Sequence, residues 1–191
     1  MCSHESVTAG QLPTPDVELT ITTPRLRLTP LVLADADDLF RVLDDVRLHR
    51  FTGGSPLTRS ELEAQIARWQ GRASPDGSQI WLNWIVRLAV TGAAVGYVQA
   101  TITNGSAAIA YVIGTAHSGQ GFATEASRAI CGALREHFGA EELVAHVHPQ
   151  HSASRAVARH VGLVPTGAFD ADGEEIWKSA SGAAGHGEPG V

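Results

Sequence analysis

Residues 107–138 read AAIAYVIGTAHSGQGFATEASRAICGALREHF, and this stretch decides the fold. It opens with an apolar run rich in β-branched residues, passes through a turn that carries Gly119 and Gly121, and continues with apolar residues at three- and four-residue spacing. This pattern predicts a strand, a tight loop and a helix that packs one face on a sheet. Because the first amides of a helix lack intrahelical partners and the helix dipole is positive there, the loop suits an anion. A phosphate-bearing cofactor is therefore the first hypothesis.

Length and charge limit the class of protein. The chain of 191 residues suffices for one domain with a sizeable core. Lysine and arginine total 14 against 20 acidic residues, a formal net charge of -6, so we expect neither a nucleic-acid partner nor a membrane partner. The amino-terminal MCSHESVTAG lacks the features of a secretory signal, and the two cysteines, Cys2 and Cys131, suggest no disulfide framework. These observations predict a cytoplasmic protein.

The segments around the central stretch complete an α/β pattern. Short turns join the two strands before it to its own strand, which predicts an antiparallel meander. Thr58 and Glu61 form a capping-box pattern at the start of a helix. The expected elements are, in chain order, a strand at 19–31, helices at 35–46 and from 58, strands at 80–88 and 95–103, the central unit, a strand at 143–148, a helix at 152–161, and strands at 165–170 and 174–178.

Both ends of the chain differ in composition from the middle. They are rich in small and polar residues and show no periodicity, which is typical of disordered tails. We therefore expect one domain at residues 18–178, flanked by disordered tails at 1–17 and 179–191.

Four stretches resemble the GNAT superfamily of acyl-CoA-dependent N-acyltransferases, in particular the branch of the ribosomal-protein alanine acetyltransferases RimJ and RimL. They are TPRLRLTPL at 23–31, VGYVQA at 95–100, the AYVIG-to-GQGFATEA unit at 110–126, and VHPQHSASRAVARHVGL at 147–163. Their order agrees with the family over nearly the whole domain. The resemblance implies an α/β GNAT fold: a mixed, mostly antiparallel sheet of six to seven strands, a V-shaped splay between the central strands, and about four helices.

The resemblance also implies acetyl-CoA as the acyl donor. In the family the loop before the long helix follows Q/R-x-x-G-x-G/A and its amides hold the pyrophosphate of coenzyme A; here Ser118 stands where Gln or Arg is usual. The pantetheine arm would pair with backbone groups of Val112 and Ile113, and an N–H near Val112 would polarise the acetyl carbonyl. The implied cofactor-binding residues are Val112, Ile113, Ser118, Gly119, Gln120, Gly121, Phe122, Ala123, Thr124, His151 and Ser154.

Two residues are candidates for the proton transfers. In this branch the last helix often opens with Asn-x-x-Ser, which is matched by His151 and Ser154, so the resemblance implies that Ser154 protonates the departing thiolate. Its alternative role is to satisfy amides of the first helical turn. A glutamate that is frequent in the branch is replaced by Ala108, and His146 is the candidate base, with an ordinary half-exposed strand histidine as the alternative.

The acceptor is expected to be a primary amine, either of a protein N-terminus or of a small molecule such as an antibiotic. The loop at residues 49–56 and the strand meander would determine which one, and we assign Phe51, Trp84 and Gln99 to the acceptor site. Dimers are frequent in the family, so a homodimer is one option. Family analogy does not choose among these acceptors.

A metal site and a dinucleotide site are weaker hypotheses. His146, His148 and His151 are spaced like zinc ligands, but no cysteine or acidic residue lies nearby in sequence, and we expect no metal. A dinucleotide-binding loop would need a third glycine where Thr124 stands.

The rival hypothesis from a different class is a GNAT-like protein without catalytic activity that binds acyl-CoA or a protein partner. It is motivated by Ser118, Ala108 and His151, which depart from the family pattern. Because Ser154 and the glycine loop are retained, the sequence favours the enzyme.

Overall fold

The strand, loop and helix expected at residues 107–138 are present as β5 (Ser106–Ile113), a short 3-10 turn and α3 (Phe122–Phe138). The computed structural model describes residues 17–51 and 53–180, so the tails expected at 1–17 and 179–191 lie outside this range except for Val17, Ser179 and Ala180; Ser179, expected in a tail, is the last residue of a strand. The other strands are β1 (Ile21–Thr22), β2 (Leu26–Pro30), β3 (Ile80–Leu88), β4 (Ala94–Thr103), β6 (Glu142–Val147), β7 (Leu163–Phe169) and β8 (Glu175–Ser179). The other helices are α1 (Ala36–Leu43), α2 (Arg59–Trp69) and α4 (Ser152–His160).

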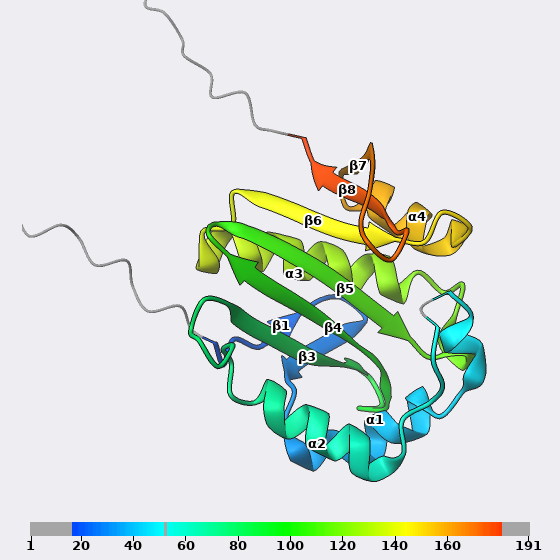
Figure 1. The fold of residues 1–191 in the computed structure, drawn as a ribbon. Coiled ribbons are helices and arrows are strands. Elements are labelled where there is room, and N and C mark those ends of the chain that lie inside the picture. Colours follow the sequence, from blue (N-terminus) through cyan, green and yellow to red (C-terminus); the bar gives the residue numbers. More distant parts are fainter. Residues whose placement is uncertain (1–16, 52, 181–191) are drawn as a thin grey trace, which may run out of the picture.

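The strands form one sheet in the order β1-β2-β3-β4-β5-β6-β8-β7, and only β5 and β6 pair in parallel (Figure 1). This is the expected α/β fold with a mostly antiparallel sheet. It has eight strands rather than six or seven because the predicted strand at 19–31 is broken in two. A turn closed by the hydrogen bond from the Thr23 amide to the Leu26 carbonyl (2.9 Å) separates β1 from β2.

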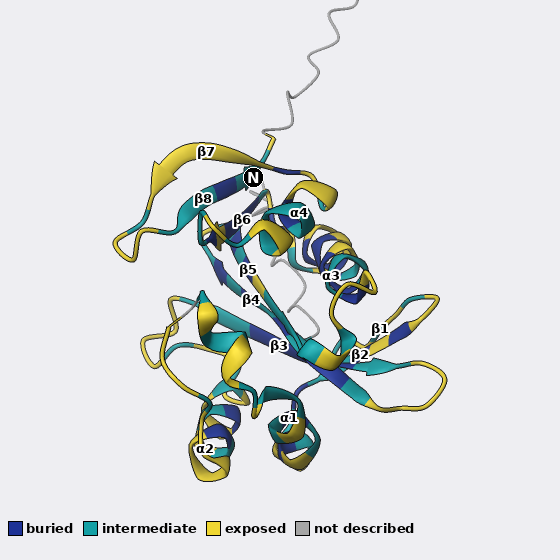
Figure 2. Cartoon of the chain, turned by 90° about the vertical axis from the view of Figure 1, so that its right-hand side faces the viewer, coloured by how far each residue is buried: buried dark blue, intermediate teal, exposed yellow. Residues whose placement is uncertain are grey.

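The helices cover the two faces of the sheet in pairs, α1 and α2 on one side and α3 and α4 on the other (Figure 2). Alternate residues of β3 and β4 therefore enter two different clusters. Leu82 and Trp84 join the larger core under α3, whereas Ile85 packs with α1 and α2. We call these sides the α3 face and the α1/α2 face.

The parallel strands β5 and β6 pair only at their start. Their register runs through Ser106–Glu142, Ala107–Leu143 and Ala108–Val144, and beyond Ala108 the two strands diverge (Figure 1). Along this divergence β5 remains paired with β4 on its other side, and β6 with β8. The backbone of Ile109–Ile113 thus turns one unpaired edge toward the opening, which is the splay that the resemblance implied.

The capping-box prediction is confirmed at the start of α2. The capping box at the start of α2 is present, because Thr58 Oγ1 accepts from the Glu61 amide (3.3 Å) and the Thr58 amide donates to the Glu61 carboxylate (2.8 Å). None of the described helices has the length and apolar character needed to cross a membrane.

Candidate active site

A cavity of about 630 Å³ opens where β5 and β6 diverge. It reaches from the loop before α3 to the amino terminus of α4 and to the loop after α1. Most residues that sequence reasoning assigned to cofactor, proton transfer or acceptor line this one cavity: Phe51, Gln99, Val112, Ile113, Ser118, Gly119, Gly121, Phe122, Ala123, Thr124, His146, His151 and Ser154. The structure thus brings three separately predicted groups together, and the molecule that occupies the cavity stays a prediction.

The glycine loop exposes backbone amides toward this cavity. Gly121 is the residue before α3 and has a φ of +79°, a left-handed conformation that a residue with a Cβ adopts only with strain. The helix begins directly after it, so the amides of Phe122, Ala123 and Thr124 occupy the first turn, where no intrahelical acceptor exists. This arrangement suits an anion such as a phosphate.

Arg25, which sequence reasoning missed, fixes the outer side of this loop. Its Nη1 donates to the Gln120 carbonyl (3.0 Å), and its guanidinium lies 4.8 Å from the centre of the Phe122 ring. Its Nε is held by Glu125 at 2.6 Å. Because the Gln120 carbonyl is engaged by Arg25, Gln120 does not line the cavity, unlike its neighbours in the loop.

Glu125 anchors β2 to α3 at this point. Its carboxylate accepts from the Thr23 hydroxyl (2.6 Å), the Arg25 amide (3.0 Å) and the Arg25 Nε. Burial raises the pKa of Glu125, but these hydrogen bonds outweigh burial and the net pKa is lowered. Glu125 is therefore a carboxylate at neutral pH, and it ties the start of the domain to the loop.

His151 caps the first turn of α4. Its Nδ1 accepts from the Ser154 amide (3.4 Å), the contact that an N-cap asparagine makes through its side-chain oxygen. Burial, together with the nearby His148, lowers the pKa of His151, which keeps the ring neutral and able to accept. The ring also stacks on Phe51, with centroids 4.3 Å apart, so the loop after α1 contacts α4 across the cavity.

Ser154 is paired with Tyr111 of β5. The Tyr111 hydroxyl lies 2.9 Å from the Ser154 carbonyl oxygen, to which it can donate, and 2.9 Å from Ser154 Oγ, a contact in which either hydroxyl can be the donor. Burial raises the pKa of Tyr111. Sequence reasoning took Tyr111 as part of an apolar strand, and only the alternation of β5 could have placed it on the side of α4.

His146 is paired with Asp170 in the turn between β7 and β8. The Nδ1 of His146 lies 2.6 Å from the Asp170 carboxylate, whose other oxygen accepts from the Asp172 and Glu174 amides (2.9 Å each). Hydrogen bonds from the Glu174 amide and from His146 hold the pKa of Asp170 below its usual range. An ionised carboxylate only accepts, so Nδ1 carries the hydrogen, and in the neutral ring Nε2 has the lone pair.

Ser154 and His146 approach the cavity from opposite faces of the sheet. Tyr111, the partner of Ser154, packs against the core under α3. His146 alternates with Ala145 and Val147, which belong to that core, and so it lies on the α1/α2 face. The cavity passes between the two strands and reaches both.

The assignment of Trp84 to the acceptor site is wrong. Trp84 is 1 % exposed in the core under α3, and its indole N–H donates to the Leu19 carbonyl (2.8 Å). Alternation along β3 places Trp81 and Asn83, not Trp84, on the α1/α2 face where Gln99 lies.

Among the described residues, no three histidine, cysteine or acidic side chains are grouped as a metal site.

Solved structures share this fold. The acetyltransferase of the GNAT family from Bacillus anthracis has a TM-score of 0.69 at 15% identity, covering 84% of this chain and 96% of its own. Mycobacterium smegmatis RimJ in complex with CoA-disulfide has a TM-score of 0.69 at 20% identity, covering 86% and 87%. The complex of AAC(6′)-Ib with Parmomycin and acetyl-CoA has a TM-score of 0.67 at 16% identity, covering 81% and 93%. At identities of 15–20%, these similarities show a shared fold and no more.

The family assignment comes from the sequence. No curated protein matches the chain. The model of the acetyltransferase (GNAT) domain matches residues 25–164, which include the glycine loop, β5, β6 and α4. The chain belongs to the GNAT acetyltransferase family, and it is an acyltransferase.

Proposed function

We propose that this protein is an acetyl-CoA-dependent N-acetyltransferase, similar to the RimJ/RimL branch, that acetylates a primary amine by direct attack on the thioester. The observation that carries the proposal is the single cavity in the splay, with an anion-binding loop at one end and two hydrogen-bonded proton-transfer candidates on its two sides. Solved relatives of the same fold hold CoA-disulfide or acetyl-CoA.

The chain offers each part of the donor a matching surface. The free amides at Phe122 to Thr124, with the positive end of the α3 dipole, suit the pyrophosphate. The unpaired edge of β5 at Val112 and Ile113 suits the amide groups of the pantetheine arm, as an added strand would. Acetyl-CoA supplies the activated acetyl group; the remaining chemistry falls to the protein.

Proton transfer is assigned to the two faces of the cavity. On the α1/α2 face, Nε2 of His146 accepts a proton from the incoming ammonium, directly or through water, while Asp170 holds the ring. On the α3 face, Ser154 Oγ donates its proton to the departing thiolate as the C–S bond breaks, and the second proton, which the nitrogen loses when the amide forms, returns to the serine through solvent. As Ser154 loses its proton, the Tyr111 hydroxyl donates a hydrogen bond to Ser154 Oγ, which limits the negative charge that forms on the serine.

The opposite placement of these groups suits a direct displacement. An amine that attacks from the α1/α2 face pushes the leaving thiolate toward the α3 face, so base and acid each lie on the side where they are needed. A backbone N–H near Val112, on the strand edge between them, polarises the acetyl carbonyl.

The acceptor is a primary amine of a protein N-terminus or of a small molecule. Among the relatives of the same fold, RimJ and AAC(6′)-Ib bear names or ligands from these two classes. His146, Gln99 and Phe51 line the part of the cavity that we assign to it.

The test of the donor site is calorimetric titration of the full chain with acetyl-CoA. We expect one site per chain that coenzyme A also occupies in competition. Absence of detectable binding, with the protein shown to be folded by circular dichroism, would contradict the proposal.

Removal of the Arg25 side chain should weaken donor binding more than it weakens the fold. Arg25→Ala frees the Gln120 carbonyl and loosens the loop, and we expect the Kd for acetyl-CoA to rise about 3- to 10-fold. Stability should fall by no more than about 1 kcal/mol, because the Arg25 side chain is half exposed and Glu125 keeps its hydrogen bonds from Thr23 and the Arg25 amide. Calorimetry and thermal unfolding measure the two effects. Arg41→Ala is the control, since Arg41 forms an exposed pair with Asp38 on α1. Equal Kd values for both variants would remove the role of Arg25.

Asp170→Asn should impair turnover through the tautomer of His146. An asparagine oxygen can still accept from the turn amides, but its NH₂ group then faces Nδ1, which must become the acceptor and transfer the hydrogen to Nε2. We expect kcat to fall at least about tenfold with little change in the KM for acetyl-CoA. The ¹⁵N shifts of His146 report the tautomer: unchanged shifts together with a lower kcat would mean that Asp170 acts only through the turn.

A further inference from the structure

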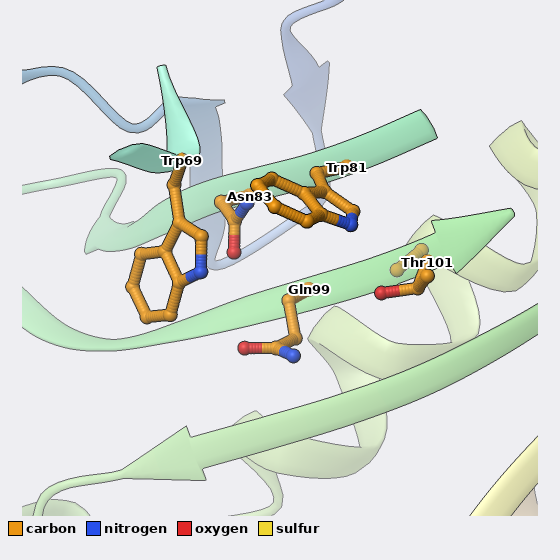
Figure 3. A pocket seen from close by; sticks show the side chains of 6 residues that line it. Trp69, Trp81, Asn83, Gln99 and Thr101 are labelled. Atoms are coloured by element: carbon orange, nitrogen blue, oxygen red, sulfur yellow. The ribbon is translucent and has the colours of Figure 1, made fainter. Parts of the chain in front are cut away.

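A second, smaller pocket lies on the α1/α2 face beside the main cavity. Its volume is about 50 Å³, and its lining residues are Trp69 from the end of α2, Trp81 and Asn83 of β3, and Gln99, Ala100 and Thr101 of β4 (Figure 3). Gln99 also lines the main cavity, so the two spaces meet at this side chain. The small pocket therefore adjoins the proposed acceptor site on the side of β3.

Asn83 makes this pocket unusual. It is 3 % exposed, and its Oδ1 has no hydrogen-bond partner among the described residues. Figure 3 shows the Asn83 carboxamide oxygen directed into the space between Trp69 and Gln99. A buried acceptor without a partner destabilises the fold relative to an apolar side chain of the same size. Such an atom therefore calls for a ligand that donates a hydrogen bond.

The surrounding groups indicate the kind of donor. Two indole rings border the pocket, and the π-face of an indole attracts a cation. The indole N–H of Trp81 is already engaged by Gln79 (3.0 Å), so it is not available to a ligand. Gln99 and Thr101 add polar atoms to the same lining. A compact ammonium group can both donate to Asn83 Oδ1 and lie against an indole ring, whereas neither a carboxylate nor an alkyl group can donate to Asn83.

The distance to the main cavity sets the size of the acceptor. Asn83 pairs with Gln99, and Gln99 with Ala110 on β5, so two strand spacings, about 10 Å, separate Asn83 from the edge of the splay. An acceptor that reaches both points needs a spacer of several carbon–carbon bonds.

We propose that this pocket binds a second ammonium group of the acceptor, so that the enzyme acetylates one amine of a diamine or polyamine-like molecule while Trp69, Trp81 and Asn83 hold the other. This inference rests on the proposed function, since it names the class of acceptor for that site.

The test compares three acceptors of equal length: hexylamine, 6-aminohexanol and 1,6-diaminohexane, with thiol release as the readout of transfer. For the wild type we expect kcat/KM to be at least about tenfold higher for the diamine than for hexylamine, with the amino alcohol between them. In Asn83→Leu, which is similar in size and removes the unpartnered oxygen, the diamine preference should fall to about threefold or less. Thr101→Val, at the rim of the same pocket, should lower it to a smaller degree.

Controls separate this inference from the proposed function. The control is Ser127→Ala, on α3 at the other face of the sheet. Ser127 Oγ, like Asn83 Oδ1, is buried and has no partner among the described residues, and its removal should leave the diamine preference unchanged. Quenching of tryptophan fluorescence by the diamine, without acetyl-CoA, reports the pocket alone, because Trp84 and Trp177 are fully buried and Trp69 and Trp81 are not.

The outcomes are distinct. If amines are acetylated but Asn83→Leu keeps the wild-type preference, the ammonium pocket is overturned and the acetyltransferase stands. If the diamine quenches the wild type and not Asn83→Leu, but no amine is acetylated, the pocket stands and the proposed function fails. Absence of both quenching and diamine preference overturns the inference.

Discussion

Ser154→Ala is expected to lower kcat about a hundredfold, the lower end of what a positioned general acid contributes, while the Kd for acetyl-CoA changes less than about threefold. The substitution removes the hydroxyl that we assign as proton donor on the α3 face. In the wild type this hydroxyl lies 2.9 Å from the Tyr111 hydroxyl. The helix cap survives, because the contact from His151 is to the Ser154 backbone amide. Steady-state thiol release and calorimetry measure the two quantities.

Two neighbouring substitutions make this result specific. Ser154→Thr keeps a hydroxyl and should retain more activity than the alanine variant. Ser152→Ala alters an exposed serine of the same helical turn and should leave kcat unchanged. If Ser154→Ala turned over like the wild type, the assignment of Ser154 as the acid would be lost.

Gly96→Ala is expected to damage both the fold and the donor site. A Cβ at Gly96 would lie 2.0 Å from the Val112 carbonyl oxygen and 2.9 Å from the Ile113 Cα, and both are backbone atoms that cannot rotate away. The end of β5 must shift, at a cost of about 3 kcal/mol or more, which lowers the Tm by about 5–10 °C for a domain of this size. The opposite edge of the same strand end is the one we assign to the pantetheine arm and would shift with it, so the Kd for acetyl-CoA should rise by at least about tenfold even at temperatures where the variant is folded.

Gly132→Ala is the matched control for this substitution. Gly132 lies on the exposed side of α3 with no atom within 4 Å of its added Cβ, so alanine should stabilise the helix by about 0.5–1 kcal/mol. Thermal unfolding of the two variants therefore should move in opposite directions. A Gly96→Ala protein with unchanged Tm and Kd would contradict the close approach of β4 and β5.

The sequence predicted the fold well because its signals were local. The strand expected at 80–88 is β3 at its observed bounds, and the glycines that mark the loop expected before the long helix do precede α3. The short β1 was not separated from β2 in the strand expected at 19–31, because two residues carry too little pattern.

Residues that a motif or strand pattern marks could be assigned to the cavity from the sequence, but their partners from other elements could not. The loop from Ser118 to Thr124 could be recognised along the chain, whereas Arg25, Tyr111 and Asp170 reach the site from other elements through tertiary packing. No spacing rule joins residues that lie so far apart in sequence. The Trp84 error has a related cause: alternation divides β3 into two faces, but which face is the core depends on where α3 packs.

The most direct test of the account is to identify the reaction product. The wild-type chain, acetyl-CoA and 1,6-diaminohexane or an N-terminal alanine peptide are incubated together, and the mass of the amine and the release of coenzyme A are followed. The account predicts an amine that gains one acetyl group for each coenzyme A released, and an unchanged amine when Ser154→Ala replaces the wild type over the same time. Acetyl-CoA that binds but leaves every amine of a broad panel unmodified would contradict it.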